Sequence, residues 1–174
     1  MRELCRRLKQ RGARRILDVG CGTGKLALFI AERMQDVCVV GIDTDAAKIE
    51  KAHERAMRGR VRFEVQSATQ TGFKDASFDA VVSLKALHEI SDADAALREA
   101  FRVLRAGGSI FVIDWVRCPA TESHAHSPLY FTEESMREAL LNAGFEHVSV
   151  EKSESGELML ASGLKRRRTA KPPK

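Results

Sequence analysis

Three glycines stand within five residues directly after an apolar run, in the stretch LDVGCGTGKLA at residues 17–27. Glycine adopts positive φ angles without steric cost and lets a ligand approach the main chain closely. The residues that follow are apolar at helical spacing, so a strand, a tight turn and a helix succeed one another here. This order is typical of the first unit of an α/β sheet whose glycine turn holds a ligand.

The alternation of strand and helix continues along the chain. Apolar runs typical of strands occupy residues 14–19, 37–43, 61–66, 78–84 and 108–116. Patterns of helical period lie at residues 24–34, 45–57, 91–108 and 133–144. Two last strand-like runs, 145–151 and 157–162, flank a turn signal and indicate a hairpin. This order predicts the α/β fold class: a doubly wound, Rossmann-like, mostly parallel seven-stranded sheet with helices on both faces and an antiparallel C-terminal hairpin.

The helix ends carry signals of their own. The predicted N-caps, all with a short side-chain oxygen, are Thr44 or Asp45, Ser91 in a capping box with Asp94, and Thr132. The pair Gly107 and Gly108 is expected to stop the helix that Ser91 starts.

Length and composition indicate one soluble globular domain. The chain has 174 residues, of which 44% are hydrophobic and 30% charged. Its apolar runs are too short to span a membrane, and its basic start lacks the apolar core of a secretory signal. The four cysteines lack CxxC spacing, so neither a zinc site nor a disulfide framework is expected, and Cys38 should be a reduced, buried thiol. We expect a cytoplasmic protein with no membrane segment and no metal.

Charge is divided unevenly along the chain. The net charge is +5, but residues 165–174 hold six Lys or Arg and no acid, and residues 1–15 hold seven Lys or Arg and one acid. A basic end can bind nucleic acid. A short Lys/Arg run with two prolines is, however, more typical of a solvated terminus. We assign residues 1–164 to the folded domain and residues 165–174 to a basic disordered tail.

The glycine turn admits three kinds of ligand. A P-loop needs GxxxxGK followed by Ser or Thr, whereas Lys25 is followed by Leu26, which disfavours a nucleoside triphosphate. A dinucleotide fold needs GxGxxG, and the glycines here are one residue too closely spaced. Asp18 stands two residues before the first glycine, where a carboxylate repels a pyrophosphate but suits an amino group. The turn therefore favours a zwitterionic ligand.

Four motifs occur in order at ordinary spacing: LDVGCGTG, VVGIDTD, SFDAVVSLKALHEI and FRVLRAGGSIFVID. Over nearly the whole chain this series resembles the class I S-adenosylmethionine-dependent methyltransferases. The resemblance implies methyltransferase activity with S-adenosylmethionine as cofactor. It assigns cofactor contacts to Asp18, Gly20, Cys21, Gly22, Gly24, Asp43, Thr44, Ser67, Ala68, Ser83 and Leu84.

The chemistry of these residues agrees with the roles that the resemblance implies. The main chain from Gly20 to Gly22 would lie against the methionine part of the cofactor. Asp18 would orient its amino group, directly or through backbone and water. Asp43, at the end of the second strand, would accept the two ribose hydroxyls. The alternative role for Asp43 is that of an acid that merely favours the helix dipole.

The third strand departs from the family pattern. Where relatives usually read Asp-Ala, with the carboxylate on the adenine amino group, this chain has Gln66, Ser67 and Ala68. Ser67 can still accept a hydrogen bond, but a neutral acceptor contributes about 1 kcal/mol where a charged one gives about 2 kcal/mol. We therefore expect modest cofactor affinity. The backbone N–H of Ala68 would still meet the adenine ring, and Ser83 and Leu84 would complete the floor of the site.

Methyl transfer from a sulfonium is an in-line displacement. The protein must chiefly hold a nucleophile about 3 Å from the methyl carbon and exclude water, so no metal is required. His88 is the candidate catalytic residue, with Glu89 beside it, because a base after the fourth strand would take a proton from the acceptor. Packing is the alternative role for His88. The histidines His124 and His126 and the thiol of Cys118 lack a further metal ligand at suitable spacing, which favours a solvated loop.

The acceptor is less constrained than the cofactor. Motifs of the amino-base and cytosine methyltransferases are absent, and Tyr130 and Trp115 would stack on an acceptor or simply pack. The glycine motif lies close to the first residue, so we expect few helices before it and a site that is open or closed by the second subunit of a homodimer. A small-molecule acceptor is the leading hypothesis. The alternatives are methylation of RNA or protein through the basic ends, and cofactor binding without turnover; a nicotinamide oxidoreductase is least favoured.

Overall fold

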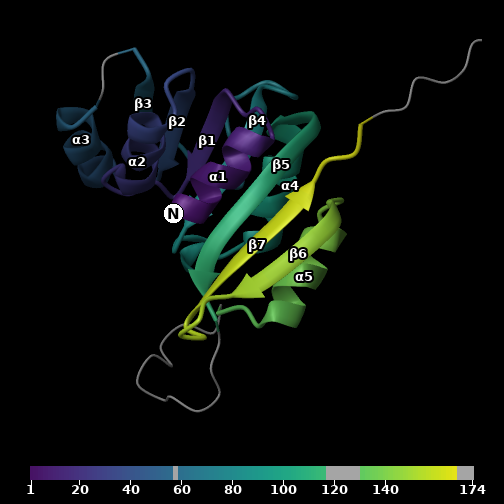
Figure 1. Ribbon diagram of the computed structural model, residues 1–174. Helices are drawn as coiled ribbons and strands as arrows, with labels where there is room; N and C mark the ends of the chain where they lie inside the picture. Colours follow the sequence, from purple (N-terminus) through teal and green to yellow (C-terminus); the bar gives the residue numbers. More distant parts are fainter. Residues whose placement is uncertain (57–58, 117–129, 168–174) are drawn as a thin grey trace, which may run out of the picture.

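Seven strands form one sheet within the residues that the computed structural model describes, 1–56, 59–116 and 130–167 (Figure 1). The strands are β1 (Arg15–Val19), β2 (Cys38–Asp43), β3 (Val61–Val65), β4 (Phe78–Leu84), β5 (Leu104–Trp115), β6 (Glu146–Lys152) and β7 (Leu158–Leu164). Their order across the sheet is β3-β2-β1-β4-β5-β7-β6. Strands β1 to β5 pair in parallel, whereas β7 runs antiparallel to both β5 and β6. The predicted sheet with its antiparallel C-terminal hairpin is confirmed.

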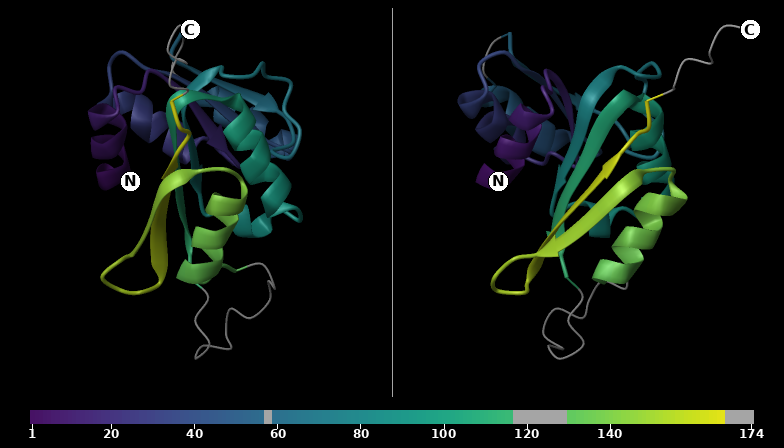
Figure 2. Two further views of the ribbon diagram at one scale, coloured as in Figure 1. Left: turned by 90° about the vertical axis from the view of Figure 1, so that its right-hand side faces the viewer. Right: turned by 45° about the vertical axis from the view of Figure 1, so that its right-hand side comes forward.

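Helices cover both faces of the sheet, as predicted (Figure 2). They are α1 (Arg2–Gln10), α2 (Lys25–Arg33), α3 (Ala46–Glu54), α4 (Ala93–Val103) and α5 (Glu133–Asn142), with a short 3-10 helix, η1 (Leu87–Glu89), after β4. Ile16 and Leu17 of β1 belong to two different apolar clusters. The first cluster contains the buried side chains of α1 to α3 and the second those of α4 and α5, because neighbouring residues of a strand point to opposite faces. In the described part of the chain, no helix has the length and apolar character needed to cross a membrane.

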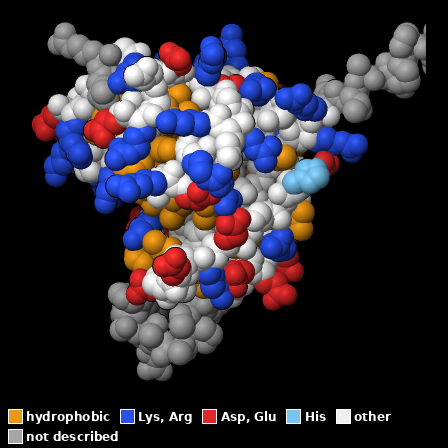
Figure 3. Space-filling model, viewed as in Figure 1, with side chains coloured by type: hydrophobic (Ala, Val, Ile, Leu, Met, Phe, Trp, Pro, Cys, Tyr) orange, Lys and Arg blue, Asp and Glu red, His pale blue; other side chains and the backbone are white. Residues whose placement is uncertain are grey.

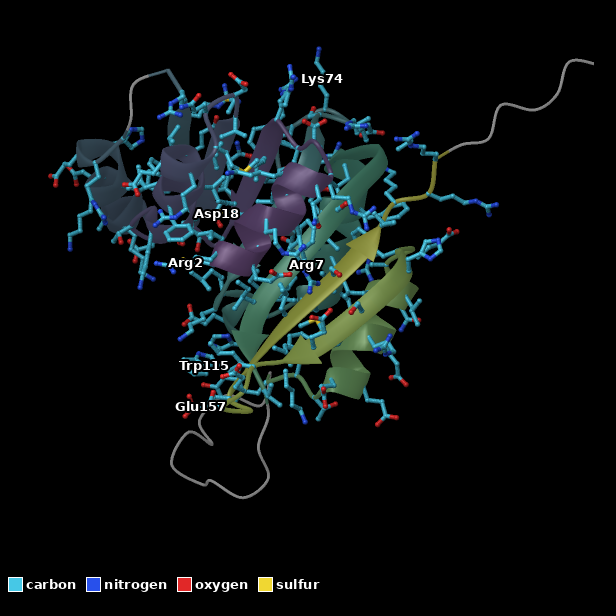
Figure 4. The ribbon with its side chains drawn as sticks, viewed as in Figure 1. Arg2, Arg7, Asp18, Lys74, Trp115 and Glu157 are labelled. Atoms are coloured by element: carbon cyan, nitrogen blue, oxygen red, sulfur yellow. The ribbon has the colours of Figure 1, made fainter. Side chains whose placement is uncertain are left out.

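The N-terminal helix α1 was not anticipated from the sequence. It buries Leu4 and Leu8, one turn apart, against the first apolar cluster. Its Arg7 donates to Glu151 of β6 at 2.7 Å, so the helix is tied to the far edge of the sheet (Figure 4). An apolar stripe this short gives little periodic signal among the many charged residues.

Two predicted helix caps are confirmed and a third is wrong. Asp45 and Thr132 cap α3 and α5 with their side-chain oxygens. The cap of α4 is Asp92, whose carboxylate accepts from the backbone N–H of Ala95 at 2.8 Å. The capping box expected at Ser91 therefore does not start this helix, because the carboxylate one residue later does so.

The predicted glycine stop of α4 is also wrong. Gly107 and Gly108 lie inside β5, where its pairing with β4 shifts register, and the φ of Gly107 is +80°. The helix end is satisfied by Lys165, whose Nζ donates to the carbonyl oxygens of Phe101 and Leu104 at 2.6 and 2.8 Å. Lys165 is thus hydrogen-bonded to the fold, although the sequence analysis placed it in the tail.

The cysteines differ from expectation at one position. Cys38 is exposed, because it is the first residue of β2 and burial of that strand starts at Val39. Cys5 and Cys21 are buried, and all three described thiols are free. Cys118 lies outside the described residues.

The connection from β3 to β4 is held against α4 by a carboxylate. Glu99 accepts from the backbone N–H and the hydroxyl of Thr71 at 2.7 and 2.6 Å, and from Arg102 at 2.7 Å. The hydrogen bond from Arg102 is the largest cause that lowers the pKa of Glu99 to about 2. These hydrogen bonds fix the segment that carries Ser67 and Ala68 near the carboxyl ends of the parallel strands.

Candidate functional site

The three glycines of the β1–α2 turn have different local environments. All three have positive φ, +67° at Gly20, +51° at Gly22 and +81° at Gly24. A Cβ on Gly20 would lie 2.3 Å from the Cβ of Ala86, and one on Gly24 would lie 2.5 Å from Phe63. Nothing lies within 4 Å of the corresponding point at Gly22. The outer glycines therefore allow close packing, and the middle one leaves open space for a ligand.

A cavity of about 1000 Å³ lies at the carboxyl ends of β1, β2 and β4. Nine of the predicted cofactor residues line it: Asp18, Gly20, Cys21, Gly22, Asp43, Thr44, Ser67, Ala68 and Leu84. Gly24 and Ser83 do not line it. Gly24 packs on Phe63, and Ser83 is buried in the sheet between Val19 of β1 and Val112 of β5. The cavity lies at the point where the strand order reverses, the usual ligand site of such sheets.

Asp43 joins the two central βα turns. Its Oδ2 accepts from the backbone N–H of Gly22 at 2.8 Å, and its Oδ1 accepts from the N–H of Asp45 at 3.0 Å. The N-terminus of α3 is capped by Asp45, so Asp43 is not needed for that role. A carboxylate has about four acceptor positions, which leaves each oxygen of Asp43 able to accept another hydrogen bond at the cavity.

Asp18 is a buried acid with one oxygen unpaired. Its Oδ2 accepts from the N–H of Ala27 in the first turn of α2 at 3.1 Å, while its Oδ1 has no partner among the described residues. Burial raises the pKa of Asp18 to about 8, and the negative charge of Asp43 adds to the rise. A buried polar atom without a partner is costly. An orphaned acceptor in the cavity wall fits a positively charged donor such as an amino group.

Cys21 contributes shape rather than reactivity. Its N–H donates to the carbonyl of Ile42 at 3.0 Å, which docks the turn onto β2. Burial raises the pKa of its thiol, so the side chain is neutral. A Cβ on Gly41 would lie 2.8 Å from its Sγ, so the glycine in β2 makes room for it. The isolated glycine of the VVGID run was the sequence signal for this close approach.

Ser67, which stands where relatives usually have an acid, lies in a segment held by hydrogen bonds between its own residues. Ser67 shares a hydrogen bond of 2.8 Å with the hydroxyl of Thr69. Gln66 donates to Glu64 at 2.5 Å and accepts from the N–H of Gly72 at 2.8 Å. Ser67 and Ala68 both face the cavity, so a hydroxyl and a main-chain edge stand at this wall.

His88 lies behind the cavity wall rather than in it. Its Nδ1 is 2.6 Å from Oδ1 of Asp114, whose Oδ2 accepts from the His88 N–H at 3.2 Å, and its ring stacks on Tyr130 with centroids 5.0 Å apart. Both members of the pair are buried. Glu89 does line the cavity, and its Oε1 is 3.8 Å from Nε2 of His88. Sequence reasoning missed Asp114, although an acid at the end of a wholly apolar strand was a signal for it.

Other residues that were not among the predicted site residues also line the cavity. Ile113 at the end of β5, Leu158 at the start of β7 and Lys85 after β4 all line it. The loop histidines His124 and His126 lie outside the described residues. Within 1–56, 59–116 and 130–167, no group of His, Cys, Asp and Glu is arranged to hold a metal ion.

Comparison with known proteins identifies the family. A family profile described as "Methyltransferase domain" matches residues 16–108. The 27-O-demethylrifamycin SV methyltransferase of Amycolatopsis mediterranei is 38% identical over 65% of this chain and 43% of its own length. The O-methyltransferase resE of Aspergillus sclerotiorum is 33% identical over 83% of this chain and 59% of its length. Phosphoethanolamine N-methyltransferase 1 of Arabidopsis thaliana is 36% identical over 70% and 25%. The chain thus spans less than two thirds of the length of each of these relatives.

Solved structures agree in fold. The crystal structure of the [4+2]-cyclase SpnF has a TM-score of 0.82 at 25% identity and covers 95% of this chain and 80% of its own. A SAM-dependent methyltransferase from Aquifex aeolicus has a TM-score of 0.77 at 20% identity, with 92% and 88% covered. The glycine turn, the acid at the end of β2, the strand order and the sequence matches agree: the chain belongs to the class I S-adenosylmethionine-dependent methyltransferases, whose methyl donor is S-adenosylmethionine.

Proposed function

We propose that this protein transfers a methyl group from S-adenosylmethionine to a small-molecule acceptor. The observation that carries the proposal is the size and composition of the cavity. At about 1000 Å³ it is at the upper end of the range of about 300–1000 Å³ for small-molecule sites, so it has room for a cofactor and a second ligand. Two of the relatives named above are named for small acceptors, a demethylrifamycin and phosphoethanolamine.

The residues at one end of the cavity would hold the cofactor. Asp43 would accept from the ribose hydroxyls, Asp18 would pair with the amino group, and the open main chain at Gly22 would lie against the methionine part. Ser67 and Ala68 would meet the adenine edge. When bound, S-adenosylmethionine supplies an electrophilic methyl group on a sulfonium. The protein's part is to orient the acceptor and to exclude water.

Proton transfer, where the acceptor arrives protonated, would fall to Glu89. Its carboxylate lines the cavity, whereas the ring of His88 is buried behind it. We therefore propose His88 as a positioning residue that acts through Glu89, with Asp114 holding its Nδ1. This keeps the predicted involvement of His88 and moves the contact with the acceptor to its neighbour.

Cofactor binding without methyl transfer is the second candidate function. Two observations favour it. Ser67 stands where an acid is usual, which weakens the expected hold on adenine. One of the structurally similar proteins is named a [4+2]-cyclase, so a protein with this fold can be named for a reaction other than methyl transfer.

Calorimetry with S-adenosylmethionine and S-adenosylhomocysteine tests the site. We expect Asp43→Asn to raise the dissociation constant about thirtyfold, or about 2 kcal/mol, because two hydroxyls lose a charged acceptor. The matched control is Asp36→Asn, an exposed acid outside the cavity, which should leave binding unchanged. Equal binding by both variants would show that the cavity is misassigned. Methylated products from a broad panel of acceptors are detected by mass spectrometry. Tight cofactor binding without any such product would favour cofactor binding without methyl transfer.

A further inference from the structure

One lysine in the wall of the cavity has a strained backbone. Lys85 follows β4 with φ at +54°, a region that costs residues other than glycine free energy. Its N–H donates to the carbonyl of Ile113 at 2.7 Å, so pairing with β5 fixes this conformation. Ala76 and His147 are the other described non-glycine residues with positive φ, and neither lines the cavity. Strain of this kind gathers at functional sites, where the surrounding structure holds it in place.

The charge of Lys85 is held on an aromatic ring. Its Nζ lies 3.6 Å from the centroid of the Trp115 ring. Among the described residues, no carboxylate forms an ion pair with Lys85 or with Lys25, another lysine of the cavity wall, whereas Lys48 pairs with Asp45 at 3.9 Å. Lys85 differs from Lys25 in its contact with an aromatic ring. An exposed cation–π contact is weak. A ligand anion offers a charge-assisted hydrogen bond, which is stronger, so the ammonium group is available to a ligand.

The surroundings of this cation are apolar. Trp115 lies directly across from Leu158 in the antiparallel pairing of β5 and β7, and both stand at the carboxyl end of β5 (Figure 4). Leu158 and Ile113 line the same cavity as Lys85, and the carbonyl of Ile113 accepts from the Lys85 N–H. A single cation beside an aromatic ring and aliphatic side chains matches a molecule with an apolar body and one anionic group.

We propose that Lys85 is the centre of the acceptor subsite and that this subsite takes an organic anion, a carboxylate or a phosphate monoester. The ring of Trp115 lies beside Lys85 and does not itself line the cavity, whereas Leu158 and Ile113 do. Lys85 leaves the ring to pair with the anionic group, and the apolar body of the ligand packs on Leu158 and Ile113. The proposal rests on the proposed function, because it names the acceptor class for the same cavity.

Trp115 is the sole tryptophan of the chain, so its fluorescence reports whether the Lys85 ammonium group stays on its ring. The probes are hexanoate, hexyl phosphate and hexanol, which share an apolar body and differ in the charged group. They are titrated into the protein with and without saturating S-adenosylhomocysteine. We expect both anions to change the Trp115 emission and to bind at least about tenfold more tightly than hexanol. The tighter of the two anions identifies carboxylate or phosphate as the recognised group.

Substitutions assign the effect to Lys85. We expect Lys85→Met to raise the dissociation constants of both anions about tenfold, and Lys85→Arg to restore them to within about threefold. The matched control is Lys74→Met, an exposed lysine at the opposite end of the molecule from Trp115, which should bind as the unchanged protein does (Figure 4).

Three results would overturn the proposal: hexanol binding as tightly as the anions, no binding of any probe at millimolar concentration, or unchanged anion affinity in Lys85→Met. A loss of S-adenosylhomocysteine binding in Lys85→Met would also overturn it, since Lys85 would then serve the cofactor. Failure of the proposed function gives a different result, namely no cofactor binding by the unchanged protein. In that case the titration of the three probes without S-adenosylhomocysteine still shows whether the subsite binds anions.

Discussion

At the residue scale, Asp18 shows most clearly how the fold prepares a ligand site. One of its oxygens accepts from the N–H of Ala27 in the first turn of α2, and the other is buried with no partner in the part of the chain that the structure describes. Burial holds the pKa of Asp18 near 8, far above its ordinary value of 3.8, so the free protein carries a proton there at neutral pH. A cationic amino group at this oxygen would replace that proton. The free energy that burial of the Asp18 carboxyl costs the free protein would thus be offset when the amino group binds.

We predict that Asp18→Asn alters the pH dependence of stability. Because the folded-state pKa is raised, the unfolded chain releases this proton at lower pH than the native state, and native stability falls as pH rises from about 4 to about 8. The Asn variant lacks this loss. Its unfolding free energy should therefore increase relative to the unchanged protein by up to about 1.4 kcal/mol per pH unit in that window. Urea unfolding at about pH 5 and about pH 7 measures the difference, and parallel curves would show that Asp18 is ionised in both states.

Asp18→Asn should weaken cofactor binding, although it increases the unfolding free energy at neutral pH. The variant offers no negative charge to an amino group, so S-adenosylhomocysteine should bind more weakly even where the free protein is more stable. A variant with improved stability and unchanged affinity would remove Asp18 from the site.

At the element scale, the β1–α2 turn depends on glycine for two separate reasons. Gly24 begins α2 at φ +81° and presses on Phe63 of β3, so both backbone conformation and space require it. Gly156, in the turn before β7, has φ +73° but open space around it. A comparison of alanine substitutions at Gly24 and Gly156 therefore distinguishes the cost of the backbone conformation, which both share, from the cost of steric overlap, which only Gly24 has.

We predict that Gly24→Ala destabilises the protein more than Gly156→Ala. Both variants lose about 1 kcal/mol from the left-handed conformation. Gly24→Ala adds about 1–3 kcal/mol of overpacking, because the ring of Phe63 is buried and must move. Thermal or urea unfolding of the two variants gives the comparison. Equal losses would mean that Phe63 shifts freely and that the contact between the β1–α2 turn and β3 is loose.

At the scale of the whole molecule, positive and negative side chains are distributed unequally over the face shown in Figure 3. Lys and Arg predominate over the upper part of the face in Figure 3, and Asp and Glu near its lower end. Part of the basic charge of α1 is neutralised, since Glu3 pairs with Arg6 and Arg7, and Arg7 also pairs with Glu151. This weakens the case for α1 as a nucleic-acid surface.

We predict that removing residues 168–174 leaves cofactor affinity unchanged to within about twofold, because the residues that line the cavity are retained. Methylation of a small acceptor should be retained as well. Calorimetry and the product assay measure both. If the truncation instead abolished activity on RNA, together with the salt dependence that phosphate contacts confer, the macromolecular alternative would be correct.

The fold class, the glycine turn and the position of Asp43 were predictable from the amino-acid sequence alone. Periodicity and turn chemistry are properties of neighbouring residues, and an acid that ends one strand must lie at the same edge of a parallel sheet as the turn that ends the next. The local pattern also misled where a contact from elsewhere took over, as when Lys165, from the end of β7, closed α4 in place of a glycine.

Which side chains come into contact depends on the tertiary structure. The register of β4 against β5 puts Asp114 beside His88, so the histidine is drawn behind the cavity wall and Glu89 stands in it. The same two strands set Lys85 on Trp115, and their neighbour β7 adds Leu158. These partners are far apart along the chain. Their contact follows from strand register and packing, which no local pattern encodes.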